Sequence, residues 1–394
     1  MCMFVVNGVT VDARVRREAA SLAGAGAEVV VLGLRERSQP SEETLEGFTV
    51  LRLRRDPFRR GLERDRGAGV VRRLLAPASQ GLAVLDYSIR ALARGWRLDA
   101  DVYHAHDLVT LPVAWAAGRL RGAHVVYDAH ELFTEIGRLS PWARRPLRWL
   151  EAFLIRRADR VITVNESIAG ELSRRYGVAA PLVLLNCPRT AGRALRDGSG
   201  RLRARLGVAA GVPLALYQGM FMPHRGLENL VRAARELRRA HVAFMGWGPL
   251  LDTLRALAVV EGVGDRVHFM EGVPLSDLLE YTSGADVGLI PYRNVGLNNY
   301  YTSPNKLFEY CVAGVPVAAS RLPELVKVVE GRGIGVTFDP ERPADIAAAV
   351  NGLLEDPARL AEVRANVARA APAFTWEQQA PRLLDLYASL EGVS

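Results

Sequence analysis

A short run near residue 300 combines residue types that bind a phosphorylated ligand. The sequence SPNKLFEY places Ser303 and Pro304 where a helix begins, with Lys306 just inside it. Proline at the first helical position lacks an N–H that would have no partner there, and the free N–H groups of Asn305, Lys306 and Leu307 point out of the helix end. The helix dipole and the lysine charge both favour an anion, so this segment is predicted to bind phosphate.

Glu309 follows Lys306 by three residues and lies close to the same face of the predicted helix. A carboxylate there can accept hydrogen bonds from the two hydroxyls of a ribose. The plainer alternative is a surface ion pair between Lys306 and Glu309. Lys306 is one of only two lysines in a chain that otherwise uses arginine, which singles out its position. The segment from Ser303 to Glu309 therefore predicts a nucleotide-diphosphate ligand.

A second candidate loop lies in YQGMFMPHRGLENLV, which reads as a strand, a loop with Gly219 and a helix that opens beside Arg225. An arginine can bind a diphosphate bidentately, although Arg225 could also be an ordinary charged residue near a helix start. Gly246 and the stretch before Val273 supply small residues that let the backbone approach a base or a sugar. The sequence contains neither GxGxxG nor GxxxxGK[ST], so it lacks a dinucleotide fingerprint and a Walker loop.

Three of the four histidines in the first half of the chain are candidate site residues. DVYHAHD places His104 and His106 at strand spacing, and His130 follows the next strand in HVVYDAHELF. No set of histidines and carboxylates shows metal-ligand spacing, so we predict no metal and assign His130 to hydrogen bonding at a ligand cleft. Gly8 ends the first strand, where it either lets the backbone approach a donor phosphate or forms a plain turn.

Charge and composition limit the kinds of partner that the protein is expected to bind. The chain has 394 residues and a net charge of +8. The segment from Arg52 to Arg73 contains nine arginines and three acidic residues. That basic segment is either a solvated loop or a peripheral contact with anionic lipid, and it lacks the interleaved aromatics that stack bases. We expect no nucleic-acid partner, no export leader in MCMFVVNGVT and no disulfide framework among three scattered cysteines, which fits the cytoplasm.

Short β-branched runs alternate with amphipathic stretches throughout, as in parallel sheets with crossover helices. The predicted strands are 3–6, 28–32, 102–104, 124–127, 160–164, 182–185, 214–217, 242–245, 267–269, 287–290, 315–318 and 335–338. The pattern breaks in the turn-rich stretch after Asn186, which predicts a linker. The sequence thus predicts two Rossmann-like, doubly wound α/β domains, 1–186 and 213–372, joined by a linker at 187–212 and followed by a helix in 373–394. Ligands of such folds bind outside the carboxyl ends of the strands, so two facing domains form a cleft.

With these motifs in place, the chain resembles the GT-B glycosyltransferases over nearly its full length, specifically the retaining family 4. DARVRREAASLAGAGAEV, VYDAHELF and ADRVITVNESIAGEL are similar to segments of the family's first domain. YQGMFMPHRGLENLV resembles its phosphate-binding loop and SPNKLFEYCVAGVPVAAS its donor-binding helix. FTWEQQAPRLLDLY resembles the last helix, which in the family crosses back to the first domain.

The resemblance implies a role for individual residues of the donor site. It places Arg225 and Lys306 on the diphosphate, Glu309 on the ribose, the backbone of Val273 on the base and His130 on the transferred sugar. Two positions depart from the family pattern. An acidic residue expected eight positions before Glu309 is replaced by Tyr301, an uncertain sugar contact. An arginine common after the phosphate-loop glycine is replaced by Met220, and we hypothesise that His224 substitutes for it in part.

The resemblance also implies front-face transfer with retention from a nucleotide-diphosphate sugar to an acceptor hydroxyl, without a metal or other cofactor. The departing diphosphate itself would help to remove the acceptor proton. Two enzymes that share the architecture are alternatives: a sugar-nucleotide epimerase would need no acceptor, and a phosphorylase would need phosphate and a glycan. Because of Tyr301 and Met220, a non-catalytic sugar-binding protein of the same fold is a further alternative.

Overall fold

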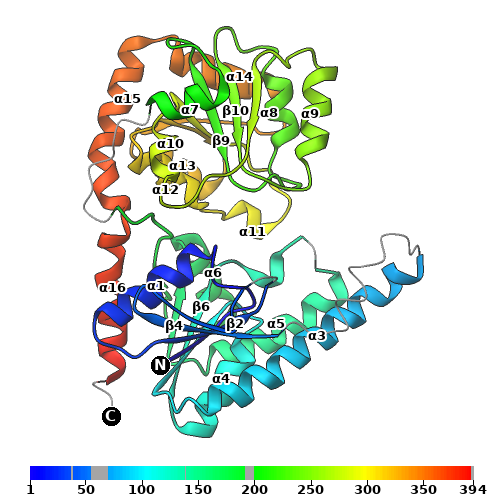
Figure 1. Cartoon of the computed structure of the whole chain (residues 1–394), viewed down its shortest axis with the longest axis vertical. Coiled ribbons are helices and arrows are strands. Elements are labelled where there is room, and N and C mark those ends of the chain that lie inside the picture. The colour runs from blue at the N-terminus through cyan, green and yellow to red at the C-terminus, as the bar shows by residue number, and fades with distance from the viewer. Residues whose placement is uncertain (37–38, 55–69, 138, 191–198, 392–394) are drawn as a thin grey trace. The chain divides into compact units, whose positions relative to one another are not determined.

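The computed structural model describes residues 1–36, 39–54, 70–137, 139–190 and 199–391, and for 70–81 the backbone alone. The described chain divides into two compact units (Figure 1). The first unit holds Met1–Thr134, Arg138–Leu184 and Ala380–Ser394, and the second holds Glu135–Gly137 and Leu185–Gln379. The last helix, α16 (Trp376–Glu391), therefore begins in the second unit and ends in the first.

The first unit is built on an eight-stranded sheet of order β3-β4-β2-β1-β5-β6-β7-β8, in which only β3 runs antiparallel to its neighbour. Its strands are β1 (Cys2–Phe4), β2 (Val30–Leu34), β3 (Glu42–Leu45), β4 (Phe48–Leu53), β5 (Val102–His106), β6 (His124–Ala129), β7 (Arg160–Thr163) and β8 (Leu182–Val183). The connecting helices are α1 (Ala13–Gly24), α3 (Val70–Trp96), α4 (Leu111–Arg121), α5 (Pro141–Ile155) and α6 (Glu166–Tyr176), with a 3-10 turn, η1 (Phe133–Glu135).

The second unit holds a six-stranded, fully parallel sheet of order β11-β10-β9-β12-β13-β14. Its strands are β9 (Leu214–Gln218), β10 (His241–Met245), β11 (Val267–Met270), β12 (Val287–Ile290), β13 (Val317–Ser320) and β14 (Gly335–Phe338). The helices are α7 (Ser199–Leu206), α8 (Leu227–Ala233), α9 (Leu251–Val260), α10 (Leu278–Thr282), α11 (Leu297–Tyr300), α12 (Asn305–Val312), α13 (Pro323–Val329), α14 (Pro343–Leu354) and α15 (Pro357–Ala370), followed by a 3-10 turn, η2 (Ala371–Phe374).

Both sheets change direction of winding at one point, between β1 and β5 in the first unit and between β9 and β12 in the second. The central strands β1, β5, β9, β12 and β13 are buried because helices cover both faces of each sheet, as parallel sheets require (Figure 1). The predicted pair of doubly wound α/β domains is confirmed. In such sheets the ligand site lies beyond the carboxyl ends of the strands at the change of direction, which directs attention to the loops after β1, β5, β9 and β12.

Two of the strands, β3 and β4, are absent from the sequence prediction. Strand β4 changes the interpretation of the basic segment. Arg52, the first residue of that segment, lies in β4 with 5% of its surface exposed. Its guanidinium donates to the Glu43 carboxylate at 2.7 Å and to the Gly8 carbonyl at 3.0 Å. Arg52 therefore stabilises the sheet edge and is no part of a lipid-facing surface, while residues 55–69 lie outside the described chain.

The predicted linker at 187–212 also takes part in a core. Cys187, Leu202 and Val208 are buried in the hydrophobic core of the second unit. Leu202 and Leu206 of α7, four residues apart on the helix, both pack in or against this core. Of the described helices, none combines the length and the apolar character needed to cross a bilayer.

Candidate active site

The loops after β9 and β12 approach each other closely in the second unit. At Gly226 the backbone has φ of 70°, and an added Cβ would lie 1.8 Å from the carbonyl oxygen of Pro291, which directly follows β12. Only glycine fits this approach. Gly226 caps the start of α8 and fixes the loop that carries Arg225.

Lys306 is buried at the start of α12, with 6% of its surface exposed. Its Nζ lies 3.7 Å from the ring centroid of Tyr217, the penultimate residue of β9, and 5.1 Å from that of Tyr292. Burial, followed by repulsion from Arg225, holds the pKa of the Lys306 ammonium well below its usual range, while Glu309 opposes the shift. A second positive charge nearby and a low-dielectric setting make this position favourable for an anion.

Arg225 stacks on the other aromatic ring of the site, with its guanidinium carbon 4.0 Å from the centroid of Tyr292. Among the described residues, no acidic side chain forms an ion pair with Arg225 or Lys306. Cation–π contacts partly stabilise both charges but do not neutralise them. Two cations are thus gathered at the change of winding direction, neither of them in an ion pair within the described chain, although the Glu309 carboxylate acts on Lys306 from a greater distance.

The alternative of a Lys306–Glu309 surface pair is wrong, because Lys306 is buried and the described residues form no ion pair of 4.0 Å or less between the two. Glu309 instead accepts a hydrogen bond of 2.6 Å from the Gln218 amide. The hydroxyl of Thr282 donates to the other end of Gln218 at 2.7 Å. This relay fixes which way the Gln218 amide faces and so holds the Glu309 carboxylate in one orientation.

The start of α12 differs in detail from the prediction. The helix begins at Asn305, with Pro304 in the capping position rather than at the first helical residue. The Leu307 N–H donates to the Pro304 carbonyl at 3.0 Å, so it does not point free out of the helix as predicted. The side chain of Asn305 accepts a hydrogen bond from Asn186 at 2.7 Å.

The other predicted donor residues of this unit lie in loops around the same strand ends. A Cβ on Gly219 would lie 3.4 Å from the Lys306 Nζ, and one on Gly246 would lie 2.0 Å from the Gly219 carbonyl oxygen, so both glycines allow close backbone packing. Ser303 and Val273 are half-buried. The ring of Tyr301 lies 5.3 Å from that of Tyr300. Their roles toward a ligand stay predictions.

Three of the four histidines in the first unit, His104, His106 and His130, lie toward the carboxyl ends of β5 and β6. These strands pair in parallel, with His106 opposite Asp128. The Asp128 carboxylate is fully buried and forms a hydrogen bond of 2.9 Å with the His130 Nε2. The His106 Nδ1 lies 3.1 Å from the same His130 nitrogen. His104 contacts the Tyr387 hydroxyl of α16 through its Nδ1 at 2.5 Å.

Arg14 holds the Asp128 carboxylate from α1. Its Nε and Nη2 donate to the two carboxylate oxygens at 2.7 Å each, and its Nη1 donates to the Leu184 carbonyl at 2.7 Å. Although burial disfavours a charge there, Arg14 and His130 hold the pKa of Asp128 well below its usual range. A buried bidentate pair of this kind is strongly orienting, because the carboxylate cannot rotate without losing both bonds.

His130 is the charged member of the histidine group. Burial alone would lower its pKa, but the carboxylates of Asp107 and Asp128 raise it to about 10. Asp107 lies 3.5 Å from the His130 Nδ1 and accepts the His130 backbone N–H at 3.2 Å. Burial lowers the pKa of His104 and of His106, which are both neutral at pH 7. His130 is therefore an imidazolium that can donate a proton or a hydrogen bond.

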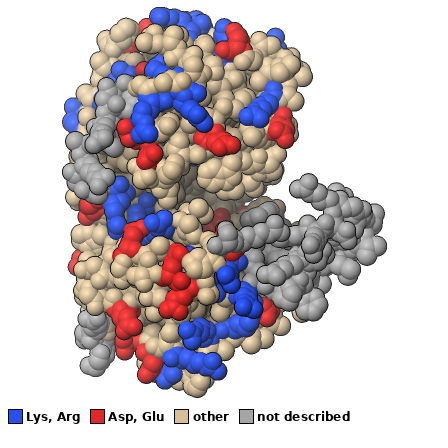
Figure 2. All heavy atoms as spheres, viewed as in Figure 1, with Lys and Arg blue, Asp and Glu red and all other residues tan. Residues whose placement is uncertain are grey.

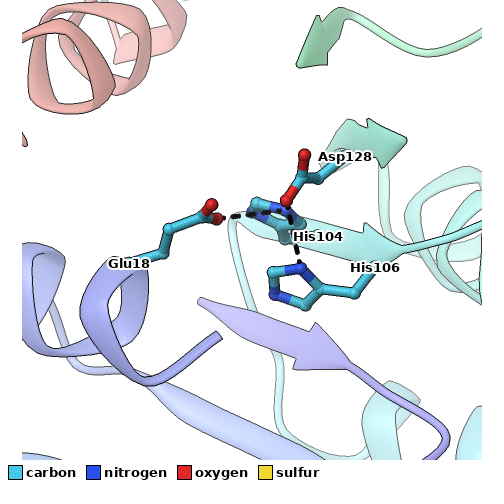
Figure 3. Close-up of side chains that lie close together, drawn as sticks. All are labelled: Glu18, His104, His106 and Asp128. Carbon is cyan, nitrogen blue, oxygen red and sulfur yellow. Dashed lines mark ion pairs between the residues drawn. The ribbon is translucent and has the colours of Figure 1, made fainter. Parts of the chain in front are cut away.

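The fold brings together four metal-capable side chains, although their spacing in the sequence shows no metal-ligand pattern. Figure 3 shows Glu18, His104, His106 and Asp128 pointing toward one another, and one ligand atom of each falls within 4.8 Å of the others. Arg14 binds both Asp128 oxygens and lies 3.0 Å from Glu18. A cation would have to displace that guanidinium, so these residues fit a metal poorly and fit a proton-holding network well.

Gly8 serves packing in the first unit. It is buried after β1, its carbonyl accepts the Arg52 hydrogen bond, and an added Cβ would lie 2.6 Å from the Gln39 side chain. A ligand role for Gly8 stays a prediction.

Sequence reasoning overlooked the residues that orient the site, Arg14, Asp128, Gln218, Tyr217 and Tyr292. A charged residue inside an otherwise apolar strand is the signal that could have found Asp128, since such a residue is rarely buried without a partner. The partners themselves lie far away in the chain. Arg14 and Asp128 are 114 residues apart, and Gln218 and Glu309 are 91 apart.

Two family profiles together cover most of the chain. Residues 10–188 match the family described as "Glycosyl transferase 4-like domain", and residues 212–356 match "Glycosyl transferases group 1". The first match spans the histidine group of the first unit, and the second spans Arg225, Lys306 and Glu309 of the second unit.

Several known proteins are similar to this chain over almost its whole length. The chain is 29% identical to a glycogen synthase of Mycobacterium tuberculosis, with 93% of this chain and 88% of that protein covered. It is 29% identical to D-inositol 3-phosphate glycosyltransferase 1 of Catenulispora acidiphila, with 90% and 84% covered. Sucrose-phosphate synthase from Thermosynechococcus elongatus has the same fold, with a TM-score of 0.81, 21% identity and 100% and 99% coverage. Anabaena HepE in complex with UDP and glucose has a TM-score of 0.74, 16% identity and 98% and 99% coverage.

Proposed function

Because this chain belongs to the glycosyltransferases of GT-B fold, and is an enzyme that moves a sugar from a nucleotide-sugar donor, we propose that it does so with retention as a member of family 4. The donor assignment rests on Arg225 and Lys306, two cations that follow β9 and β12 and form no ion pair within the described chain. We assign both cations and the N–H groups at the start of α12 to the diphosphate. We assign Glu309, oriented by Gln218, to the ribose.

The chemistry follows from where charge develops. As the bond between the sugar carbon and the diphosphate oxygen breaks, negative charge grows on the leaving diphosphate, and fixed cations stabilise it more than they stabilise the intact donor. The acceptor oxygen bonds to the same sugar carbon on the same face, and its proton passes to an oxygen of the departing diphosphate. The lowered pKa of Lys306 predicts that diphosphate binding strengthens the hold on its proton.

His130 is assigned to the transferred sugar. As an imidazolium it can donate a hydrogen bond to a sugar hydroxyl, and Asp107 and Asp128 keep it charged at neutral pH. No step is assigned to a metal or another cofactor. The acceptor stays a hydroxyl of unspecified chemistry, since the similar proteins include a glycogen synthase and an inositol phosphate glycosyltransferase, whose named products and substrates differ.

The test begins with thermal shift against a panel of nucleotide sugars, starting with UDP-glucose, which is bound in a solved structure of Anabaena HepE. Transfer is then measured with the stabilising donor, and NMR of the product reports whether the anomeric configuration is retained. Lys306→Ala is expected to lower turnover by on the order of 10²-fold. Lys327→Ala is the matched control, because it removes the chain's other lysine, which is exposed on α13.

Normal turnover of Lys306→Ala would refute the diphosphate assignment, and an inverted product would refute retention. Donor conversion without any acceptor would indicate the epimerase, and dependence on free phosphate and a glycan would indicate the phosphorylase. Donor binding without hydrolysis or transfer would indicate a sugar-binding protein.

A further inference from the structure

Helix α5 of the first unit carries two tryptophans that almost entirely face solvent. Trp142 is 87% exposed and Trp149 is 81% exposed. Phe153, at 44%, and Pro146 are exposed beside them. Large aromatic side chains are normally at least partly buried, so two such tryptophans on one helix need an explanation.

The exposed residues of α5 form one continuous face. Successive residues of an α-helix turn by about 100°, so Trp142, Pro146, Trp149 and Phe153 lie within roughly 60° of one another. Glu151 lies about 180° from Trp142 by the same geometry. It is buried and accepts hydrogen bonds from the hydroxyls of Tyr127 and Tyr176 at 2.9 and 2.6 Å. The opposite side of α5 is thus fastened to the unit, which leaves the aromatic face turned outward.

Arginines border the aromatic face. Arg145, Arg156 and Arg157 are exposed at or just after α5, and no acidic side chain of the described chain forms an ion pair with any of them. The Arg157 guanidinium carbon lies 3.6 Å from the centroid of Phe153. The only carboxylate within α5 is the buried Glu151. This differs from the surface drawn in Figure 2, where basic and acidic side chains are interspersed.

We propose that the face of α5 formed by Trp142, Arg145, Trp149 and Phe153, the α5 face, docks on an anionic lipid surface. Tryptophan rings prefer the headgroup level of a bilayer, where the apolar ring is sheltered and the indole N–H stays hydrated. The arginines meet lipid phosphates. Such a helix lies in the plane of the interface, and its binding combines apolar burial with attraction to anionic headgroups.

The charge pattern favours lipid over a second copy of this chain. A two-fold contact places the same patch of both subunits against each other, so the arginines of one α5 face would meet those of the other. Like charges brought together in this way oppose association. An anionic surface neutralises them instead. This inference does not depend on the donor or the acceptor of the sugar transfer.

Vesicle sedimentation of the full chain tests the proposal, with phosphatidylcholine vesicles that either contain or lack phosphatidylglycerol. We expect binding to the anionic vesicles alone. Trp142→Ala/Trp149→Ala is expected to abolish it without lowering the melting temperature, because both rings are exposed. Val259→Ala/Val260→Ala is the matched control, since these apolar residues of α9 are 77% and 81% exposed.

The charge contribution is tested separately. Arg145→Ala is expected to lower the partition coefficient about fivefold, and Arg359→Ala, which removes an exposed arginine of α15, is expected to leave it unchanged. Three outcomes overturn the proposal. They are equal binding to vesicles without phosphatidylglycerol, anionic binding that survives the double tryptophan substitution, and a dimer in sedimentation equilibrium that this substitution dissociates.

Discussion

The charge on His130 leads to a prediction that can be worked through in numbers. Burial is outweighed by Asp107 and Asp128, which raise the pKa of His130 from 6.5 to about 10. A shift of this size corresponds to about 5 kcal/mol of folding free energy as an upper estimate, at about 1.36 kcal/mol per unit. Since the folded pKa exceeds the unfolded one, this stabilisation is fully present below pH 6.5. It is lost as the pH rises toward 10.

Asp107→Asn isolates one of the two carboxylates. The Asp107 pKa of about 6 means that this carboxyl is ionised at pH 7 to 8. Asparagine keeps an oxygen for the His130 backbone N–H but removes the negative charge 3.5 Å from Nδ1. We expect the pKa of His130 to fall by about one to three units. Asp128 and its Arg14 partner are untouched by this change.

NMR of protein labelled at histidine provides the assay. The imidazole signals of the seven histidines are followed from pH 6 to 10, and His130→Gln identifies the signal of interest. In the native chain His130 is expected to stay protonated past pH 8, and in Asp107→Asn its midpoint moves down. A His130 midpoint near 6.5 in the unmodified chain would refute the reasoning about both carboxylates.

Three further predictions concern the loop glycine, the buried arginine and the metal. Gly226→Ala should lower the melting temperature more than Gly262→Ala, because both sit at positive φ but only Gly226 meets a backbone atom, the Pro291 oxygen; equal losses in differential scanning fluorimetry would contradict this. Arg14→Met should cost about 3 to 5 kcal/mol in urea unfolding, since it strands the buried Asp128 charge; a loss below 1 kcal/mol would be inconsistent with that pair. Turnover should survive dialysis against EDTA, and a loss restored by a divalent cation would disprove metal independence.

Much of the fold could be predicted because buried parallel strands leave a strong pattern. The runs ending at Ile290 and Phe338 appear in the structure with the predicted bounds. The strand that holds Arg52 was missed because a run of arginines reads as a loop, whereas pairing with Glu43 lets one of them sit in a sheet edge. Local patterns cannot report such a pairing, since it depends on a contact made after folding.

In the candidate site, too, local features could be predicted from the sequence and contacts between distant residues could not. Lys306 and Arg225 could be singled out because a helix start and a glycine loop are local features. That neither cation forms an ion pair in the described chain is a tertiary fact that no spacing reveals. The orientation of His130 by Asp128 likewise required two neighbouring strands and α1 to come together. Sequence thus predicted the groups that meet the ligand better than the groups that hold them.

The last helix also bears on the order in which the protein is made. Ala380–Ser394 belongs to the first unit, where Tyr387 contacts His104, although the whole second unit is synthesised in between. At roughly 5 to 20 residues per second, the ribosome needs on the order of 10 to 40 seconds to cross that interval. During that time His104 of β5 lacks its contact with Tyr387, because α16 has not yet been translated. The first unit therefore begins to fold first and is completed last.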